Sequence, residues 1–226
     1  MAVEASEPKV AVVRCAGCFE KRPRTIEYDG LRTCTAVNAT GSGETGCGFG
    51  CLGCGDCVAA CSFGAIAINP STGLPEVDET KCTSCGACAK ACPRHIIEIR
   101  PKGRVIKEVP HRVYVACVNK DKGAVAKKNC QAACIGCGKC QKVCKFDAIT
   151  VEGNVAYINP EKCKACGLCA RECPTGAITT TWPLPVIKPK AADDKTQKAA
   201  EPKPAPAAKP QAENTPNNNN TEGGKQ

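Results

Sequence analysis

Four segments of the sequence repeat one cysteine spacing, and this spacing constrains the fold more than any other feature. Each segment reads C-x2-C-x2-C-x3-C. Three thiols set so closely can wrap a loop around three corners of a cubane, while the fourth points away from it. The spacing therefore predicts [4Fe–4S] clusters. The four runs are Cys51/Cys54/Cys57/Cys61, Cys82/Cys85/Cys88/Cys92, Cys134/Cys137/Cys140/Cys144 and Cys163/Cys166/Cys169/Cys173.

The fourth cysteine of such a run ligates the neighbouring cluster in two-cluster bacterial ferredoxins. The same exchange predicts at least four clusters here, each held by three cysteines of one run and the last cysteine of its partner run. The predicted ligand sets are Cys51, Cys54, Cys57 and Cys92 for cluster one; Cys82, Cys85, Cys88 and Cys61 for cluster two; Cys134, Cys137, Cys140 and Cys173 for cluster three; and Cys163, Cys166, Cys169 and Cys144 for cluster four.

A glycine follows the second cysteine of every run. Because glycine has no Cβ, we expect it to let backbone amides approach the cluster sulfurs, where their hydrogen bonds tune the reduction potential. These glycines are Gly55, Gly86, Gly138 and Gly167.

The chain is an internal duplication. Ten cysteines of the first half recur in the second half, six of them shifted by 83 positions and four by 81. In this match Cys34 and Cys47 correspond to Cys117 and Cys130, and only Cys15 and Cys18 have no counterpart. A match of this length predicts two tandem copies of one module.

Regular structure is expected to be sparse. Each run leads through a turn into a brief strand, and hairpins are predicted over residues 64–82 and 147–163, where turn residues separate short apolar stretches. One-turn helices are predicted after the third cysteine of each run. The predicted fold class is α+β: two tandem bacterial-type 2[4Fe–4S] ferredoxin modules with small hairpins and one-turn helices.

The sequence divides into five parts. Residues 183–226 hold eight of the 17 prolines and no aromatic residue, so we expect a disordered tail, with a short docking segment as the alternative. The predicted parts are 1–50, an N-terminal segment containing cysteines; 51–100, the first 2[4Fe–4S] module; 101–133, a connecting segment with Cys117 and Cys130; 134–182, the second 2[4Fe–4S] module; and 183–226, the tail.

Six cysteines lie outside the four runs. Those that precede the first run, Cys15, Cys18, Cys34 and Cys47, are predicted to hold a fifth cluster. For Cys117 and Cys130 three alternatives stay open: exchange into cluster three, a cluster shared with the first copy, or free thiols.

Composition argues against several classes of protein. The formal net charge of +9 favours a polyanionic partner, but each cluster with four cysteine ligands carries about −2, so four clusters offset about eight charges. Zinc ribbons use two C-x2-C knuckles separated by a longer loop, which is not the spacing here.

No stretch approaches the 18–20 apolar residues of a membrane span, and residues 1–14 lack a secretory signal. Cysteine kept in a reducing compartment binds metal more often than it forms disulfides.

Five segments resemble the B subunit of the Rnf complex, the ion-translocating ferredoxin:NAD oxidoreductase of bacterial membranes. They are VVRCAGC, TGCGFGCLGCGDC, KCTSCGACAKACP, VACVNKDKGAVAKKNCQAACIGCGKC and KCKACGLCARECPTGAI, and the resemblance covers about residues 10 to 182. Family members begin with a membrane helix and a further cysteine-rich domain. This sequence resembles only their soluble C-terminal polyferredoxin part, which implies a peripheral position on the cytoplasmic side of the bacterial inner membrane.

The resemblance implies a non-catalytic electron-transfer subunit. Its partners would be soluble ferredoxin, as electron donor or acceptor, and the other subunits of a membrane complex, with no nucleic acid. Exposed lysines ahead of the third run are a candidate docking face for an acidic ferredoxin. The alternatives are a free-standing polyferredoxin, the electron-transfer small subunit of another redox enzyme, and a zinc-binding nucleic-acid-binding protein. These lysines are Lys120, Lys122, Lys127 and Lys128.

Overall fold

Short antiparallel strand pairs, rather than one continuous sheet, make up the fold. The computed structural model describes residues 7–184, and this part of the chain contains five two-stranded sheets. The longest strands have five residues, so turns and loops around the cysteine runs form much of the backbone. Between residues 7 and 184, no helix combines the length and apolar character that a membrane crossing requires.

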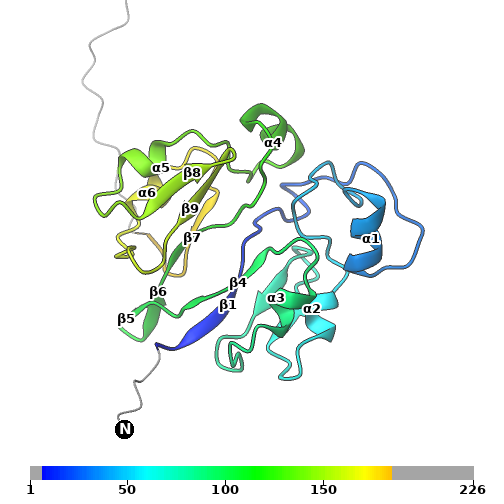
Figure 1. Cartoon of the computed structure of the whole chain (residues 1–226), viewed down its shortest axis with the longest axis horizontal. Helices are drawn as coiled ribbons and strands as arrows, with labels where there is room; N and C mark the ends of the chain where they lie inside the picture. The colour runs from blue at the N-terminus through cyan, green and yellow to red at the C-terminus, as the bar shows by residue number, and fades with distance from the viewer. Residues whose placement is uncertain (1–6, 185–226) are drawn as a thin grey trace, which may run out of the picture. The chain divides into compact units, whose positions relative to one another are not determined.

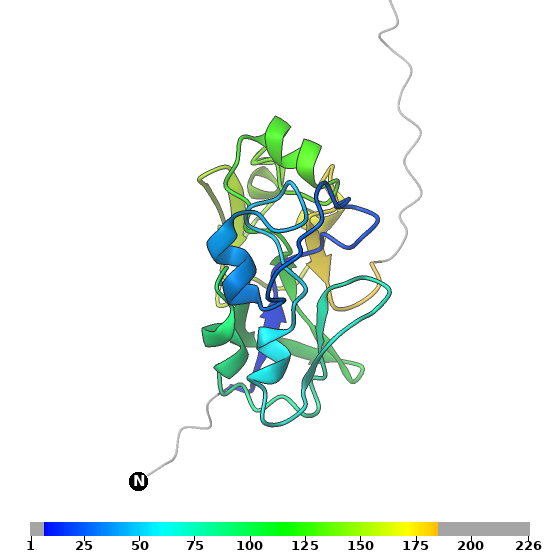
Figure 2. The ribbon, with the colours of Figure 1, turned by 90° about the vertical axis from the view of Figure 1, so that its right-hand side faces the viewer.

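Two outer strands close the first module, which we define as residues 9–101. The outer strand β1 (Lys9–Val13) pairs with β4 (Ile97–Pro101), which follows the second cysteine run (Figures 1 and 2). Three residues of β1 are buried, consistent with its β-branched sequence KVAVV. The inner elements are the hairpin strands β2 (Ile66–Ile68) and β3 (Pro75–Val77) and the helices α2 (Asp56–Ala59) and α3 (Ala87–Ala91).

The second module, residues 113–180, repeats this plan. Its outer strand β7 (Val113–Val115) pairs antiparallel with β10 (Ile178–Thr180), which follows the fourth cysteine run. The equivalent position of β1 and β7 shows that the two modules share one topology. The inner elements are the hairpin strands β8 (Ile149–Glu152) and β9 (Val155–Ile158) and the helices α5 (Lys139–Lys142) and α6 (Leu168–Arg171).

Four further elements lie outside this plan, and the sequence analysis predicted none of them. An exposed hairpin joins the modules, and one seven-residue helix stands before the first run of each module (Figure 1). The Thr33 hydroxyl accepts the backbone N–H of Ala36 at 3.2 Å and so caps the first of these helices. The elements are α1 (Cys34–Thr40), β5 (Arg104–Ile106), β6 (Val109–His111) and α4 (Gly123–Asn129).

The buried core consists largely of small side chains and thiols. In the first module, Ile66, Ile96 and Ile97 pack with cysteines of both runs, and the core of the second module has the same composition. Such a core removes little aliphatic surface from water, so the groups bound by the thiols must contribute to the stability of the fold.

A buried arginine ties the modules together. Arg100 of β4 is only 2% exposed and donates to the carbonyl of Ile158 at 3.0 Å. Its guanidinium lies 5.0 Å from the ring centroid of Tyr157, whose hydroxyl donates to Glu98 at 2.8 Å. Because these contacts join β4 to β9, they hold the modules in one compact unit.

The predicted α+β class, with two tandem modules of one plan and little regular structure, is confirmed. Both predicted hairpins are present, as β2–β3 and β8–β9. The predicted helices begin one residue before the third cysteine of each run, so that cysteine lies inside the helix. The five-part division stays a prediction: the structure pairs β1, from the predicted N-terminal segment, with β4, and most of the predicted tail lies outside the described residues.

Candidate functional site

One cavity of the first module is lined by four thiols. Three come from the second run, and the fourth is the last cysteine of the first run. The structure thus places the four cysteines predicted for cluster two around one cavity, although they come from two different runs. The thiols are those of Cys61, Cys82, Cys85 and Cys88.

Backbone amides favour the charged form of the exchanged thiol in this cavity. The Ala65 N–H donates to the Cys61 Sγ at 3.4 Å, and hydrogen bonds from Ala65 and its neighbours lower the pKa of Cys61. A thiolate is the form that binds iron, so this turn is suited to a cluster ligand.

A second cavity of the same module brings together cysteines of both runs, as predicted for cluster one. Cys51 and Cys57 of the first run line it together with Cys92 of the second run. Cys34, at the start of α1, lines the same cavity and interacts with the remaining predicted ligand, Cys54. Four thiols therefore line this cavity, and one of them, Cys34, lies outside the predicted ligand set.

The second module contains the equivalent arrangement. One cavity there is lined by the set predicted for cluster three, which is Cys134, Cys137, Cys140 and Cys173.

The cysteines predicted for cluster four also lie near one another. Cys144 interacts electrostatically with Cys163, and Cys169 interacts with Cys163 and Cys166. The last cysteine of the third run therefore lies beside the fourth run, as the exchange predicts.

Thiols of the first three sets line cavities instead of converging on one point. Among residues 7–184, no three His, Cys, Asp or Glu side chains lie close enough to share a single metal ion. A cubane presents its irons at separate corners, so its ligands stand apart around it. The thiol linings of these cavities fit a cluster of this kind.

Burial keeps several of the free thiols protonated. It raises the pKa of Cys51 and Cys169 to about 12, and that of Cys57 and Cys140 to about 11. Because iron binds the thiolate, cluster assembly must displace these protons.

The residues on either side of the second cysteine of each run adopt a left-handed backbone. The glycine after that cysteine has φ between 70° and 89° in all four runs and precedes a short helix. A Cβ on Gly138 would meet nothing within 4 Å. The left-handed backbone angle by itself accounts for glycine there.

The four cysteines predicted for a fifth cluster are not brought together as a set. Cys15 and Cys47 line one cavity, whereas Cys34 lines the cavity of Cys51, Cys57 and Cys92. Because the spacing of these cysteines is irregular, their sequence positions carry no signal for which cavity each one lines.

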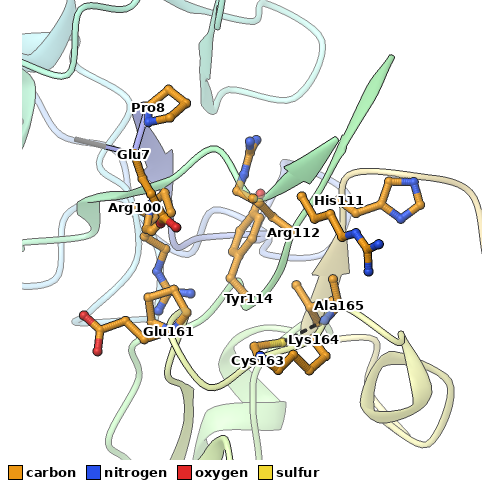
Figure 3. Close-up of a pocket in the computed structure, with 15 residues that line it drawn as sticks. Glu7, Pro8, Arg100, His111, Arg112, Tyr114, Glu161, Cys163, Lys164 and Ala165 are labelled. Carbon is orange, nitrogen blue, oxygen red and sulfur yellow. Dashed lines mark hydrogen bonds between the residues drawn. The ribbon is translucent and has the colours of Figure 1, made fainter. Parts of the chain in front are cut away.

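A larger open groove lies beside the fourth cysteine run (Figure 3). Its lining includes Arg100, Arg104, Arg112 and Lys164, and one cysteine, Cys163, whose Sγ accepts the Ala165 N–H at 3.4 Å. With one thiol in its lining, this groove is not a cluster site of the kind described above.

Comparisons with known proteins agree with the cysteine pattern. One family described as a 4Fe–4S dicluster domain matches residues 50–96 and 133–177, and a second family of the same description matches residues 81–148.

Three curated proteins are similar over most of the described chain. The B subunit of the Na⁺-translocating ferredoxin:NAD⁺ oxidoreductase complex of Acetobacterium woodii is 45% identical over 156 residues, which are 69% of this chain and 44% of that protein. The B subunit of the proton-translocating ferredoxin:NAD⁺ oxidoreductase complex of Clostridium ljungdahlii is 44% identical over 157 residues, 70% of this chain and 52% of that protein. The B subunit of the ion-translocating oxidoreductase complex of Methanosarcina acetivorans is 39% identical over 161 residues, 71% of this chain and 58% of that protein.

The resemblance found in the sequence is confirmed by these relatives. The chain spans about half the length of the curated relatives it matches.

Proposed function

The chain belongs to the 4Fe–4S dicluster proteins related to the B subunit of Rnf-type complexes, and on this premise we propose that it carries single electrons from reduced ferredoxin to a membrane-bound ion-translocating oxidoreductase. At least four [4Fe–4S] clusters would form its electron path. The ion-translocating chemistry then belongs to partner subunits.

The cavities that paired runs line together are the observation that supports this proposal. Cys61 lines a cavity with the second run, Cys92 with the first, and Cys173 with the third. Because each of these cavities combines cysteines of two runs, the clusters that we propose for one module would lie close together. When bound, a [4Fe–4S] cluster takes up and releases one electron.

The protein's own residues position these centres and shield them from water. The third cysteine of every run is buried, which excludes solvent from one side of each predicted cluster site: Cys57, Cys88, Cys140 and Cys169. The second cysteines of three runs, Cys85, Cys137 and Cys166, are instead exposed. These exposed thiols mark the points at which an electron can enter or leave the module.

The lysine patch around α4 is the docking surface that we propose for ferredoxin. Lys120, Lys122, Lys127 and Lys128 are all exposed, and the apolar side chain of Val125 beside them is 47% exposed. A cationic rim around an apolar centre suits an acidic protein partner, because complementary charge accelerates and orients the encounter. The acceptor side is proposed to face the membrane subunits on the cytoplasmic surface.

Anaerobic metal analysis followed by reduction tests the proposal. We expect at least about 16 irons per chain and an equal amount of acid-labile sulfide, and reduced ferredoxin should bleach the cluster absorbance. Zinc in place of iron, or clusters that ferredoxin fails to reduce, would overturn it. Co-purification with the membrane subunits separates this function from that of a free-standing polyferredoxin.

A further inference from the structure

Four cysteines outside the runs line one further cavity between the two modules. Cys15 and Cys47 come from the first module, and Cys117 and Cys130 from the second. The cavity at the third run is likewise lined by four thiols. The lining therefore matches that cluster site in thiol number.

The cavity is built from equivalent positions of the two modules. Cys15 follows β1 after one intervening residue, and Cys117 follows β7 in the same way. Cys47 and Cys130 each stand four residues before the first run of their own module. By position in the fold, Cys117 is thus the counterpart of Cys15, although the sequence repeat aligns it with Cys34.

The two segments that carry these thiols are hydrogen-bonded to each other. The Ala16 N–H donates to the Ala116 carbonyl at 3.0 Å, and the Gln131 N–H donates to the Lys21 carbonyl at 2.8 Å. The chain after β1 runs between the modules toward α4 (Figure 1). Backbone contacts across the interface between the modules therefore hold the segments of Cys15, Cys117 and Cys130 together.

Hydrogen-bond donors already point at the sulfurs of this cavity. The Cys51 N–H donates to the Cys15 Sγ at 3.4 Å, and the Nδ2 of Asn119 donates to the Cys47 Sγ at 3.5 Å. Asn119 is only 1% exposed, so its amide is held in a buried position. Hydrogen bonds to cysteine sulfur are the usual support of a bound cluster.

A buried positive charge in the lining lacks a counter-charge. Arg22 is 8% exposed and donates through Nη2 to the Cys51 carbonyl at 2.6 Å, whereas its Nε and Nη1 have no protein partner. An unpaired buried cation is costly. Four thiolates around a cubane would supply an overall charge of about −2 beside this guanidinium.

We propose that Cys15, Cys47, Cys117 and Cys130 bind a fifth [4Fe–4S] cluster that bridges the two modules. The inference rests on the proposed electron-transfer function and deepens it. Cys15 accepts the amide of Cys51, and Cys117 accepts the amide of Cys134, so the site adjoins the first cysteine of the leading run in each module. One electron would pass from a reduced cluster of one module to the bridging cluster and then to the other module. Each transfer oxidises the donor cluster and reduces the acceptor by one electron, with no bond formed or broken.

Iron and sulfide analysis of the anaerobically prepared chain tests the assignment. Cys15→Ala and Cys117→Ala should each lose about four irons and four sulfides, and the double variant should lose no more than either single variant. Cys18→Ala is the matched control, because Cys18 lies in the same loop but does not line the cavity, and it should retain all the iron.

Asn119→Ala supplies a second measurement that does not depend on losing the cluster. Its iron content should stay at the wild-type value while one cluster shifts in reduction potential, since a hydrogen bond to Cys47 is gone.

Retention of all the iron in Cys117→Ala, or zinc in the site, would overturn the assignment. Loss of the cluster in Cys18→Ala, with Cys130→Ala unaffected, would also overturn the assignment. It would favour a cluster held by Cys15, Cys18, Cys34 and Cys47. A wild-type chain with fewer than about 16 irons would instead contradict the proposed function itself.

Discussion

At the scale of single residues, the cluster-binding loops depend on a backbone conformation that few side chains tolerate. The residue before the second cysteine has positive φ in all four runs: 76° at Gly53, 56° at Ser84, 64° at Gly136 and 52° at Ala165. Two runs satisfy this angle with glycine and two carry the strain of a Cβ, about 1–2 kcal/mol at each position.

Exchanging glycine and alanine at this position should change stability by unequal amounts in different runs. A Cβ on Gly136 would lie 2.8 Å from the backbone oxygen of Asn154, so Gly136→Ala adds a clash to the unfavourable φ and should destabilise the loop by at least about 1–2 kcal/mol. Ala165→Gly removes a strained Cβ and should change stability by less than about 1 kcal/mol. The stability of both variants is measured as the temperature at which half of the cluster absorbance is lost, under anaerobic conditions and at one scan rate. An unchanged midpoint for Gly136→Ala would contradict the predicted clash.

The exchange of ligands predicts which cluster a given thiol supports. Cys92→Ala should damage the first cluster, because Cys92 lines the cavity of Cys51 and Cys57, whereas Cys85→Ala should damage the second. Electron paramagnetic resonance during redox titration should show the loss of different signals.

Cys34 lines the first cavity and is the obvious substitute for a missing ligand there, so both variants are best compared in a Cys34→Ala background. If Cys85→Ala and Cys92→Ala still lost the same signal in that background, each run would hold its own cluster, and the exchange would be refuted.

At the scale of elements, α4 connects the interface between the modules with the solvent. The helix ends in Lys127 and Lys128, and Cys130 follows immediately as its C-cap. A partner that docks on these lysines therefore lies next to a thiol of the proposed bridging site. Basic residues in the last turn also interact favourably with the helix dipole, so their replacement carries a small cost in helix stability.

Charge reversal on α4 should weaken ferredoxin docking without affecting the clusters. The Lys127→Glu/Lys128→Glu variant is expected to raise the KM for ferredoxin by about tenfold at low ionic strength, with a smaller effect at high salt. Lys9→Glu/Lys90→Glu is the matched control, since both residues are exposed in the first module away from α4. An equal rise in KM for the two variants would show that net charge, rather than this surface, governs docking.

At the scale of the whole molecule, the thiols replace much of an ordinary apolar core. Cysteines and alanines make up much of both buried clusters, and buried arginines occupy positions between them. Arg22, Arg100 and Arg112 are each less than 10% exposed, and Arg112 forms an ion pair with Glu79. A core of this kind stays folded only while its thiols hold their bound groups.

Removal of iron should therefore unfold the described part of the chain. Anaerobic chelation is expected to collapse residues 15–182 into a disordered chain, because little apolar burial remains to offset the conformational entropy. Amide dispersion in heteronuclear NMR spectra before and after chelation measures this. Dispersed amide signals retained by the iron-free protein would contradict the prediction.

The sequence by itself determined the features that are encoded locally. The spacing of Cys51, Cys54 and Cys57 predicts a cluster loop, because all three lie within seven residues, and the hairpins after the first and third runs follow from nearby turn residues. The same spacing predicts the exchange of the fourth cysteine, since the short step after the third cysteine turns it away from its own cluster. Cys61 and Cys92 line cavities with the partner run, as this prediction requires.

Only the tertiary structure decided the partners of the cysteines outside the runs. Cys15 and Cys117 are 102 positions apart in the chain, and they meet because β1 and β7 each close a module and then lead into the same interface. The sequence repeat pairs Cys117 with Cys34, but Cys34 lines the first cavity. Local spacing constrains contacts within a loop, whereas contacts between distant segments depend on how the modules pack. That packing involves buried groups such as Arg100, which belong to no sequence motif.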